Sequence, residues 1–206
     1  MNMQVEINAL NRVNGHPYIL KIVGSGFGVT WVDQNGRQKQ GDYIATEVVP
    51  NGELFDYVDN PMGAISEDVA KQLFLQMLAG LTFLHKTGLV NRDIKLENML
   101  VGEDFNIRMA DLGFAQLVEG RNQDGQISTF LGTPGYMAPE ILEDRSYSGI
   151  AVDMFALGVV LFAMVTKSTP FQAMGKLGGG RHLLAVDKLY QLFCLDKQAY
   201  YARYQA

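Results

Sequence analysis

Apolar residues recur at the spacing of an α-helix in four stretches, residues 1–13, 66–86, 150–166 and 187–204. Asn14-Gly15 ends the first of these helices, and Ser66 provides an N-cap for the second. The third stretch is almost wholly apolar, which predicts a helix buried in the core. The last stretch predicts one or two further helices.

Between the first two helices the pattern changes to β-strands. Residues 29–32 and 43–46 are rich in β-branched and aromatic side chains, and Asn35-Gly36 between them favours a tight turn. Residues 24–28 read Gly-Ser-Gly-Phe-Gly, whose spacing does not match a phosphate-binding glycine loop. The sequence therefore predicts a hairpin whose first strand contains a bulge.

Composition narrows the class of protein. The chain has 206 residues, 48% of them apolar, and a net charge of −5. We expect a globular protein that does not bind nucleic acid, because there is no run of Lys or Arg. We expect no membrane partner either, since residues 1–20 lack the apolar segment of a signal peptide and the apolar run at 154–165 is too short to cross ~30 Å of hydrocarbon. Cys194, the one cysteine, is expected to be a small buried residue, and the absence of an intrachain disulfide suits an intracellular compartment.

Residues 89–100 concentrate the chemistry of the chain. They read Leu-Val-Asn-Arg-Asp-Ile-Lys-Leu-Glu-Asn-Met-Leu, and Asp111-Leu112-Gly113 follows a short way on. The two segments supply two carboxylates, one ammonium and one amide: Asp93, Asp111, Lys95 and Asn98. Such a set can hold a metal-bound polyphosphate beside a hydroxyl group.

These segments resemble the catalytic loop, His-Arg-Asp-x-Lys-x-x-Asn, and the metal-binding Asp-Phe-Gly of protein kinases. Residues 132–140, Gly-Thr-Pro-Gly-Tyr-Met-Ala-Pro-Glu, are similar to the substrate-positioning loop of the serine/threonine class. The matching positions are Arg92, Asp93, Lys95, Asn98, Asp111, Gly113, Ala138, Pro139 and Glu140. The resemblance extends over nearly the whole chain and implies an α+β, protein kinase-like fold.

The resemblance also implies two lobes. Residues 1–49 correspond to part of an N-lobe, namely the end of its helix and one hairpin, and residues 50–206 correspond to a mainly helical C-lobe without its last helices. Glu6 resembles the glutamate of the N-lobe helix that pairs with a strand lysine, although a solvated glutamate is the simpler alternative. The glycine loop and that lysine would precede Glu6, so we expect a domain truncated at both ends.

Roles for site residues follow from the same resemblance, with ATP and Mg²⁺ as cofactors. Asp93 would orient the attacking hydroxyl and take its proton, and Lys95 would neutralise the γ-phosphoryl. Asn98 and Asp111 would hold Mg²⁺. The implied nucleotide-binding positions, in and after a hinge segment, are Thr46, Glu47, Val49, Glu53 and Leu100. For Pro50 to Glu53 a plain turn that opens a helix is the alternative, and both can hold at once.

Substrate choice and regulation can be predicted in the same way. Glu53 and Glu97 resemble two carboxylates that receive an arginine three residues before the target hydroxyl, unless Glu53 serves only the ribose and Glu97 only the loop. The implied regulatory residues are Arg92, Thr129 and Thr133. A phosphate on Thr129, or failing that on Ser128, would pair with Arg92.

Other residues near the catalytic motif depart from the family pattern or carry their own expectations. Asn91 stands where kinases usually have His or Tyr, and we expect this smaller, more polar residue to pack less well. Leu112 replaces the usual Phe, a mild change. Asp153 resembles an aspartate that braces the catalytic loop, whereas His85 is expected to be a packed or solvated histidine without a carboxylate partner.

The sequence therefore predicts a serine/threonine protein kinase that transfers the γ-phosphoryl of ATP to a protein hydroxyl. We expect little or no activity from the 206 residues alone, because the phosphates would lack a glycine-loop cover. The alternative is a non-catalytic, pseudokinase-like module that binds partners. A two-carboxylate hydrolase using Asp93 and Asp111 would leave Lys95 and Asn98 without a role.

Overall fold

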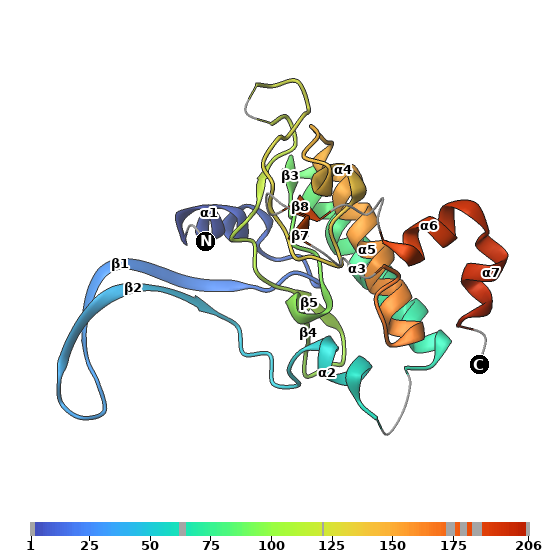
Figure 1. Cartoon of the computed structure of the whole chain (residues 1–206). Coiled ribbons are helices and arrows are strands. Elements are labelled where there is room, and N and C mark those ends of the chain that lie inside the picture. Colours follow the sequence, from blue (N-terminus) through green and yellow to red (C-terminus); the bar gives the residue numbers. More distant parts are fainter. Residues whose placement is uncertain are drawn as a thin grey trace.

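The structure is a computed structural model that describes residues 3–61, 65–120, 122–171, 176–177, 181–182 and 187–204. Its helices are α1 (Met3–Val13), α2 (Leu54–Asp59), α3 (Glu67–Lys86), η1 (Leu96–Asn98), α4 (Pro139–Leu142), α5 (Gly149–Thr166), α6 (Lys188–Leu195) and α7 (Lys197–Ala202). Its strands are β1 (Ile22–Val32), β2 (Gln38–Thr46), β3 (Leu89–Val90), β4 (Met99–Val101), β5 (Ile107–Met109), β6 (Gln116–Leu117), β7 (Lys176–Leu177) and β8 (Arg181–His182). The helices gather into one body, and the hairpin β1–β2 projects from it (Figure 1). This mixture of helices with small sheets is the predicted α+β fold.

Helices α3 and α5 pack against each other at the centre of the body (Figure 1). The hydroxyl of Ser66 accepts the N–H of Val69, so the predicted N-cap of α3 is confirmed. Helix α5 is longer than the run used to exclude a membrane span: by length and composition it could cross a bilayer, so the length argument was wrong. Half of that span is buried inside the protein, which is typical of a core helix.

The two strands of the hairpin, β1 and β2, are longer than the predicted strands at residues 29–32 and 43–46. Strands β1 and β2 pair antiparallel, with irregularities between Ile22 and Gly24 and between Gly26 and Val29, so the predicted bulge is confirmed. At the second bulge Gly28 has a φ of +61° and donates its N–H to Oδ1 of Asp42 at 2.8 Å. Large apolar side chains on both strands remain exposed, so cross-strand contacts stabilise most of the hairpin.

A continuous apolar core joins α1 to the centre of the body. Buried residues of α1, among them Leu10 and Val13, belong to the same cluster as Met77 of α3 and Met164 of α5. The chain after α1 also pairs with β5, because the N–H of Leu20 donates to the carbonyl of Met109 at 2.9 Å. Helix α1 is therefore anchored to the body independently of the hairpin.

Three short antiparallel pairs complete the described sheets, and two of them frame the catalytic segment. Strand β3 pairs with β6, and β4 pairs with β5 so that Met99 lies opposite Met109. Residues 91–98 connect β3 to β4, and Asp111 lies two residues after the end of β5. The β4–β5 pairing therefore brings Asn98 and Asp111 to the same edge.

The last stretch, predicted to form one or two helices, forms two, α6 and α7, with an aromatic cluster against α5. Tyr200 is buried there and donates its hydroxyl to the carbonyl of Pro170 at 2.9 Å. Cys194 on α6 is exposed, so its expected burial was wrong. The apolar residues around Cys194 suggested a core position, but no side chain of α6 is buried.

Candidate active site

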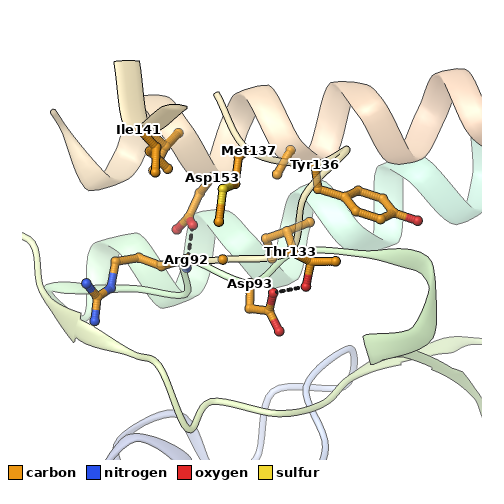
Figure 2. Close-up of a pocket in the computed structure, with 11 residues that line it drawn as sticks. Arg92, Asp93, Thr133, Tyr136, Met137, Ile141 and Asp153 are labelled. Atoms are coloured by element: carbon orange, nitrogen blue, oxygen red, sulfur yellow. Dashed lines mark hydrogen bonds between the residues drawn. The ribbon is translucent and has the colours of Figure 1, made fainter. Parts of the chain in front are cut away.

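The loop after β3 is held in place by one buried carboxylate from α5. Oδ2 of Asp153 accepts the N–H of Asn91 at 2.8 Å, and Oδ1 accepts the N–H of Arg92 at 2.7 Å. Figure 2 shows Asp153 directed at the backbone of Arg92. A buried carboxylate is tolerated because hydrogen-bond donors surround it, and here they also fix the start of the loop.

His85 is a third hydrogen-bonding partner of Asp153, which contradicts the expectation that His85 has no carboxylate partner. The Nε2 atom of His85, near the end of α3, lies 2.8 Å from Oδ2 of Asp153. The side chain of His85 is therefore partnered by a carboxylate and links α3 to the loop through α5. Sequence reasoning missed this contact because the two residues are distant in the chain and only helix packing brings them together.

Asp93 lies at the centre of the loop and is buried. Its Oδ1 accepts the hydroxyl of Thr133 at 2.6 Å, and its Oδ2 accepts the ammonium of Lys95 at 2.7 Å. Lys95 also donates to the hydroxyl of Thr133 at 3.0 Å. Figure 2 shows Thr133 facing Asp93. The catalytic motif and the later Gly-Thr-Pro segment thus meet at one carboxylate.

Asn98 joins the same network from η1. Its amide nitrogen donates to the carbonyl of Asp93 at 2.9 Å and lies 3.3 Å from Oδ2 of the same residue. The carbonyl of Asn98 accepts the N–H of Ala110 at 2.9 Å, next to Asp111. Asp93, Lys95, Asn98 and Asp111 are therefore neighbours, as the motif predicts.

Asp111 presents a carboxylate at the edge of this network. It has a φ of +56°, and its Oδ1 accepts the N–H of Gly113 at 3.1 Å. Its charge also contributes to a raised pKa at Glu6, whose main cause is burial of the Glu6 carboxyl. Within the described residues no group of three or more His, Cys, Asp or Glu side chains is placed to hold a metal. An amide oxygen and a carboxylate at one edge nevertheless fit Mg²⁺, which keeps waters and takes phosphate oxygens as its other ligands.

Glu6 lies on the side of α1 that faces this edge. Its carboxyl is partly exposed, and among the described parts of the chain no Lys or Arg forms an ion pair with it. Burial of the carboxyl raises the pKa of Glu6, and the negative charge of Asp111 adds to the effect. A positive charge placed here would relieve both acids.

The predicted hinge connects the hairpin to the body. Thr46 ends β2, and the N–H of Glu47 donates to the carbonyl of Lys21 at 2.9 Å. Oε1 of Glu47 accepts the N–H of Lys21 at 2.9 Å. The backbone and the side chain of Glu47 therefore both form hydrogen bonds with the backbone of Lys21. Glu53 forms a β-bridge with Leu100, which brings two of the predicted nucleotide-binding positions together, while Val49 lies in the connecting segment.

The segment after Asp111 carries the predicted regulatory contact. Nη1 of Arg92 donates to the hydroxyl of Thr129 at 3.2 Å, and Nε and Nη2 donate to the carbonyl of Phe114 at 2.9 and 2.8 Å. The hydroxyl of Tyr147 donates to the carbonyl of Thr129 at 2.8 Å. Thr129 itself is exposed and lies beside the guanidinium group that the sequence assigned to it.

The predicted substrate acids lie on adjacent elements. Helix α2, which begins after Glu53, contacts η1, which contains Glu97. Oε2 of Glu97 lies 3.4 Å from the hydroxyl of Tyr136. Burial, with the Glu97 charge, raises the pKa of Tyr136 to about 12, so this hydroxyl stays protonated at neutral pH.

A small cavity lies behind the loop, and Figure 2 shows side chains that line it. Its volume is about 10 Å³, room for roughly one water molecule. Its lining includes Arg92, Asp93, Tyr136, Met137 and Asp153. This cavity is too small for a substrate, so the reacting groups would bind on the open side of Asp93.

Asn91 has a hydrogen-bond partner that the sequence did not indicate. The side chain is 1% exposed, and its Oδ1 accepts the N–H of Asp93 at 2.8 Å. The polar group is therefore partnered inside the loop, and the looser packing expected at this position stays a prediction. Its residue type was visible in the sequence, but its partner depends on the fold of the loop.

Comparison with known proteins supports one family. A sequence model described as the protein kinase domain matches residues 1–200. CBL-interacting protein kinase 10 of Oryza sativa subsp. japonica is 38% identical over 130 residues, which are 63% of this chain and 28% of that protein. Probable serine/threonine-protein kinase MARK-B of Dictyostelium discoideum is 43% identical over 128 residues, 62% of this chain and 17% of that protein. CBL-interacting protein kinase 12 of Oryza sativa subsp. japonica is 38% identical over 166 residues, 81% of this chain and 28% of that protein. The chain spans less than a third of the length of these relatives. It belongs to the protein kinase domain family.

Proposed function

We propose that this chain provides the catalytic loop of a serine/threonine protein kinase. The observation that carries the proposal is the Asp93 carboxylate, held between the ammonium of Lys95 and the hydroxyl of Thr133 at 2.7 and 2.6 Å. Such a carboxylate can align a hydroxyl, and the ammonium beside it can neutralise phosphate charge. The protein kinases act on protein substrates, and we assign the same substrate class here.

In this proposal Asp93 accepts the proton of the attacking serine or threonine hydroxyl. A bond forms between that oxygen and the γ-phosphorus of ATP, while the bond from the γ-phosphorus to the bridging oxygen breaks and ADP leaves with the electron pair. Lys95 would turn its ammonium from Asp93 toward the γ-phosphoryl and neutralise the charge that develops there. Thr133 keeps Asp93 in position before the substrate arrives.

Asn98 and Asp111 are the residues we assign to Mg²⁺. The metal, when bound, would neutralise charge on the phosphates. Asn98 has its amide nitrogen engaged with Asp93, which leaves the amide oxygen for a cation. Asp111 accepts one backbone N–H, and a carboxylate has further lone pairs to offer.

We place the nucleotide at the hinge, beside Thr46, Glu47, Val49, Glu53 and Leu100. The bridge between Glu53 and Leu100 supports this, since it joins the hinge to the strand that leads from the metal-binding Asn98. Residues 1–49 and 50–206 would then be parts of an N-lobe and a C-lobe with ATP between them. An intracellular location remains a prediction.

A preference for arginine three residues before the target hydroxyl is the finer proposal for the substrate. Glu53 is exposed, and Glu97 faces Tyr136 on the neighbouring element. Two carboxylates favour a guanidinium over an ammonium through bidentate geometry. A peptide library assayed with the active kinase should show this preference, which Glu97→Gln should weaken; no preference for arginine would remove the proposal.

Phosphorylation of Thr129 is the regulatory proposal. Its hydroxyl is exposed and 3.2 Å from Nη1 of Arg92, so a phosphate there could form charge-assisted hydrogen bonds with the guanidinium. The same guanidinium donates to the carbonyl of Phe114, three residues after Asp111. A phosphate bound to Arg92 would therefore be linked through this contact to the metal-binding segment. If Thr129→Ala leaves the activity of the active kinase unchanged, this switch is not used.

The second candidate function is a pseudokinase-like module that binds partners without catalysis. Glu6 favours it, because no cation pairs with this carboxylate in the described residues and its pKa is raised. Without a cation beside Glu6 we expect the described residues to bind ATP weakly, while the groups of the catalytic loop remain in place.

Calorimetric titration of the purified chain with ATP, in Mg²⁺ and in EDTA, separates the two candidates. The kinase proposal predicts weak binding that needs Mg²⁺ and is lost in Asp111→Asn. The control is Asp68→Asn, an equal change of charge at an exposed position on α3, which should bind as the parent does. ATP binding that is absent, or that is indifferent to Mg²⁺ and Asp111, would contradict the kinase proposal.

A further inference from the structure

Asn91 occupies a special position in the catalytic loop. Its backbone N–H donates to Oδ2 of Asp153 at 2.8 Å, and its side-chain Oδ1 accepts the N–H of Asp93 at 2.8 Å. The side chain is buried, so water does not compete for this oxygen. One residue thus connects the brace on α5 to the backbone of Asp93.

The contact has the geometry of an Asx turn. An Asn oxygen that accepts the N–H two residues later closes a small ring and stands in for a backbone turn. Arg92, the residue inside the ring, has a φ of +70°, a conformation that non-glycine residues seldom adopt. The backbone at Arg92 therefore needs outside support, and the Asn91 oxygen and the Asp153 carboxylate supply it from either side.

The N–H of Asp93 completes the set of contacts on that residue. Its carbonyl is held by Asn98 at 2.9 Å and its carboxylate by Lys95 and Thr133. A phosphate can compete with Asp93 for Lys95, and a substrate hydroxyl can compete with Thr133 for the Asp93 carboxylate. The contact from Asn91 lies on the buried side and has no such competitor, so it can fix the residue while the others exchange.

We propose that Asn91 is a positioning residue that fixes the backbone of Asp93 through its side-chain oxygen. The catalytic meaning of this proposal rests on the proposed kinase function. An acceptor at this position is needed, and a side chain that only fills the space does not replace it. The oxygen sets the direction of the Asp93 carboxylate, because that side chain starts from the held backbone.

The test uses two matched pairs of variants of the 206-residue chain. Asn91→Ala and Asn91→Ser open the same space, but serine keeps an oxygen that can accept the N–H of residue 93. Asn91→Val and Asn91→Thr repeat the comparison with more volume, in case the smaller side chains prevent folding. Amide hydrogen exchange of Asp93, followed by NMR, is measured in each, with the amide of Ile107 as reference because it donates to Gln76 elsewhere in the body.

We expect Asp93 to exchange about tenfold faster in Asn91→Ala than in Asn91→Ser, and likewise in Asn91→Val than in Asn91→Thr, with Ile107 equal within each pair. Equal exchange at Asp93 within both pairs would overturn the proposal. The exchange measurement requires no phosphoryl transfer. Absence of Mg²⁺-dependent ATP binding in the titration would therefore count against the kinase function, whereas loss of the difference within the pairs would count against Asn91 alone.

Discussion

The hairpin β1–β2 and the helical body around α3 and α5 bury their apolar side chains very differently. Val32 and Trp31 of the hairpin are 67% and 43% exposed, whereas Met77 of α3 is 0% exposed. Asp93, Asn98 and Asp153 are all buried in the body. The groups that need accurate placement are therefore on the part with a continuous core, and the hairpin is held mainly by its own strand pairing.

The largest expected difference in stability between body and hairpin comes from substituting one aspartate in each. Both aspartates accept backbone N–H groups. Asp153→Ala leaves the donors of Asn91, Arg92 and His85 unpartnered in the interior, so we expect a loss of about 3–5 kcal/mol of unfolding free energy. Asp42→Ala removes one exposed contact to Gly28 in the hairpin and should lose less than about 1 kcal/mol. Urea unfolding followed by circular dichroism measures both, and equal losses would show that the hairpin is as well held as the body.

Truncation of apolar side chains gives the next largest effect. Met77→Ala creates a cavity in the core and should cost about 2–5 kcal/mol, whereas Val32→Ala should change stability by no more than about 0.5 kcal/mol. Trp31, the single tryptophan, reports on the hairpin by fluorescence, while circular dichroism reports on the helices. We expect the fluorescence transition at lower urea; coincident transitions would mean that hairpin and body unfold as one unit.

Two glycines offer a smaller, sterically matched comparison. An alanine Cβ at Gly149 would lie 2.6 and 2.8 Å from the methyl groups of buried Val90, and one at Gly26 would lie 2.6 Å from the ring of exposed Tyr43. Because Val90 has no room to move, Gly149→Ala should cost about 1–3 kcal/mol. The ring of Tyr43 can swing into solvent, so Gly26→Ala should cost less than about 1 kcal/mol. Thermal unfolding ranks the two, and a larger loss at Gly26 would contradict the comparison.

Glu6 gives the smallest expected effect and depends on pH. Burial and the nearby Asp111 charge raise the pKa of Glu6 above its ordinary value of 4.5, so the folded protein binds this proton more tightly than the unfolded chain. Folding stability therefore falls as pH rises from 4.5 through the folded value. Glu6→Gln should stabilise the chain slightly near pH 7 and have no effect near pH 3. A variant less stable than the parent near pH 7 would mean that the Glu6 carboxylate makes a favourable contact.

Much of the body could be predicted because its signals are local. The cap at Ser66, the helical spacing of the following residues and the order of Asp93, Lys95, Asn98 and Asp111 are all legible in the sequence. The bulge at residues 24–28 was also predictable, since glycines in a strand at that spacing suit a bulge and not a phosphate loop. Short-range chemistry determines each of these features.

The remainder depended on long-range packing. The pairing of His85 with Asp153 arises only when α3 and α5 lie side by side, and the Asn91 oxygen finds Asp93 only when Arg92 adopts a positive φ. Cys194 was misplaced because an apolar segment does not say which of its faces meets the core. Contacts between distant elements and conformations away from the common regions leave little trace in a single sequence.

The most direct test of the account is phosphoryl transfer from ATP to a serine- or threonine-containing peptide library in the presence of Mg²⁺, with the 206-residue chain beside Asp93→Ala. Asp68→Ala serves as the control for loss of an exposed aspartate. We predict at most a slow, Mg²⁺-dependent transfer, which falls to background in Asp93→Ala and is unchanged in Asp68→Ala, because the catalytic loop holds Asp93 between Lys95 and Thr133 before a substrate binds. Transfer that persists in Asp93→Ala would contradict the central claim that this loop carries kinase chemistry.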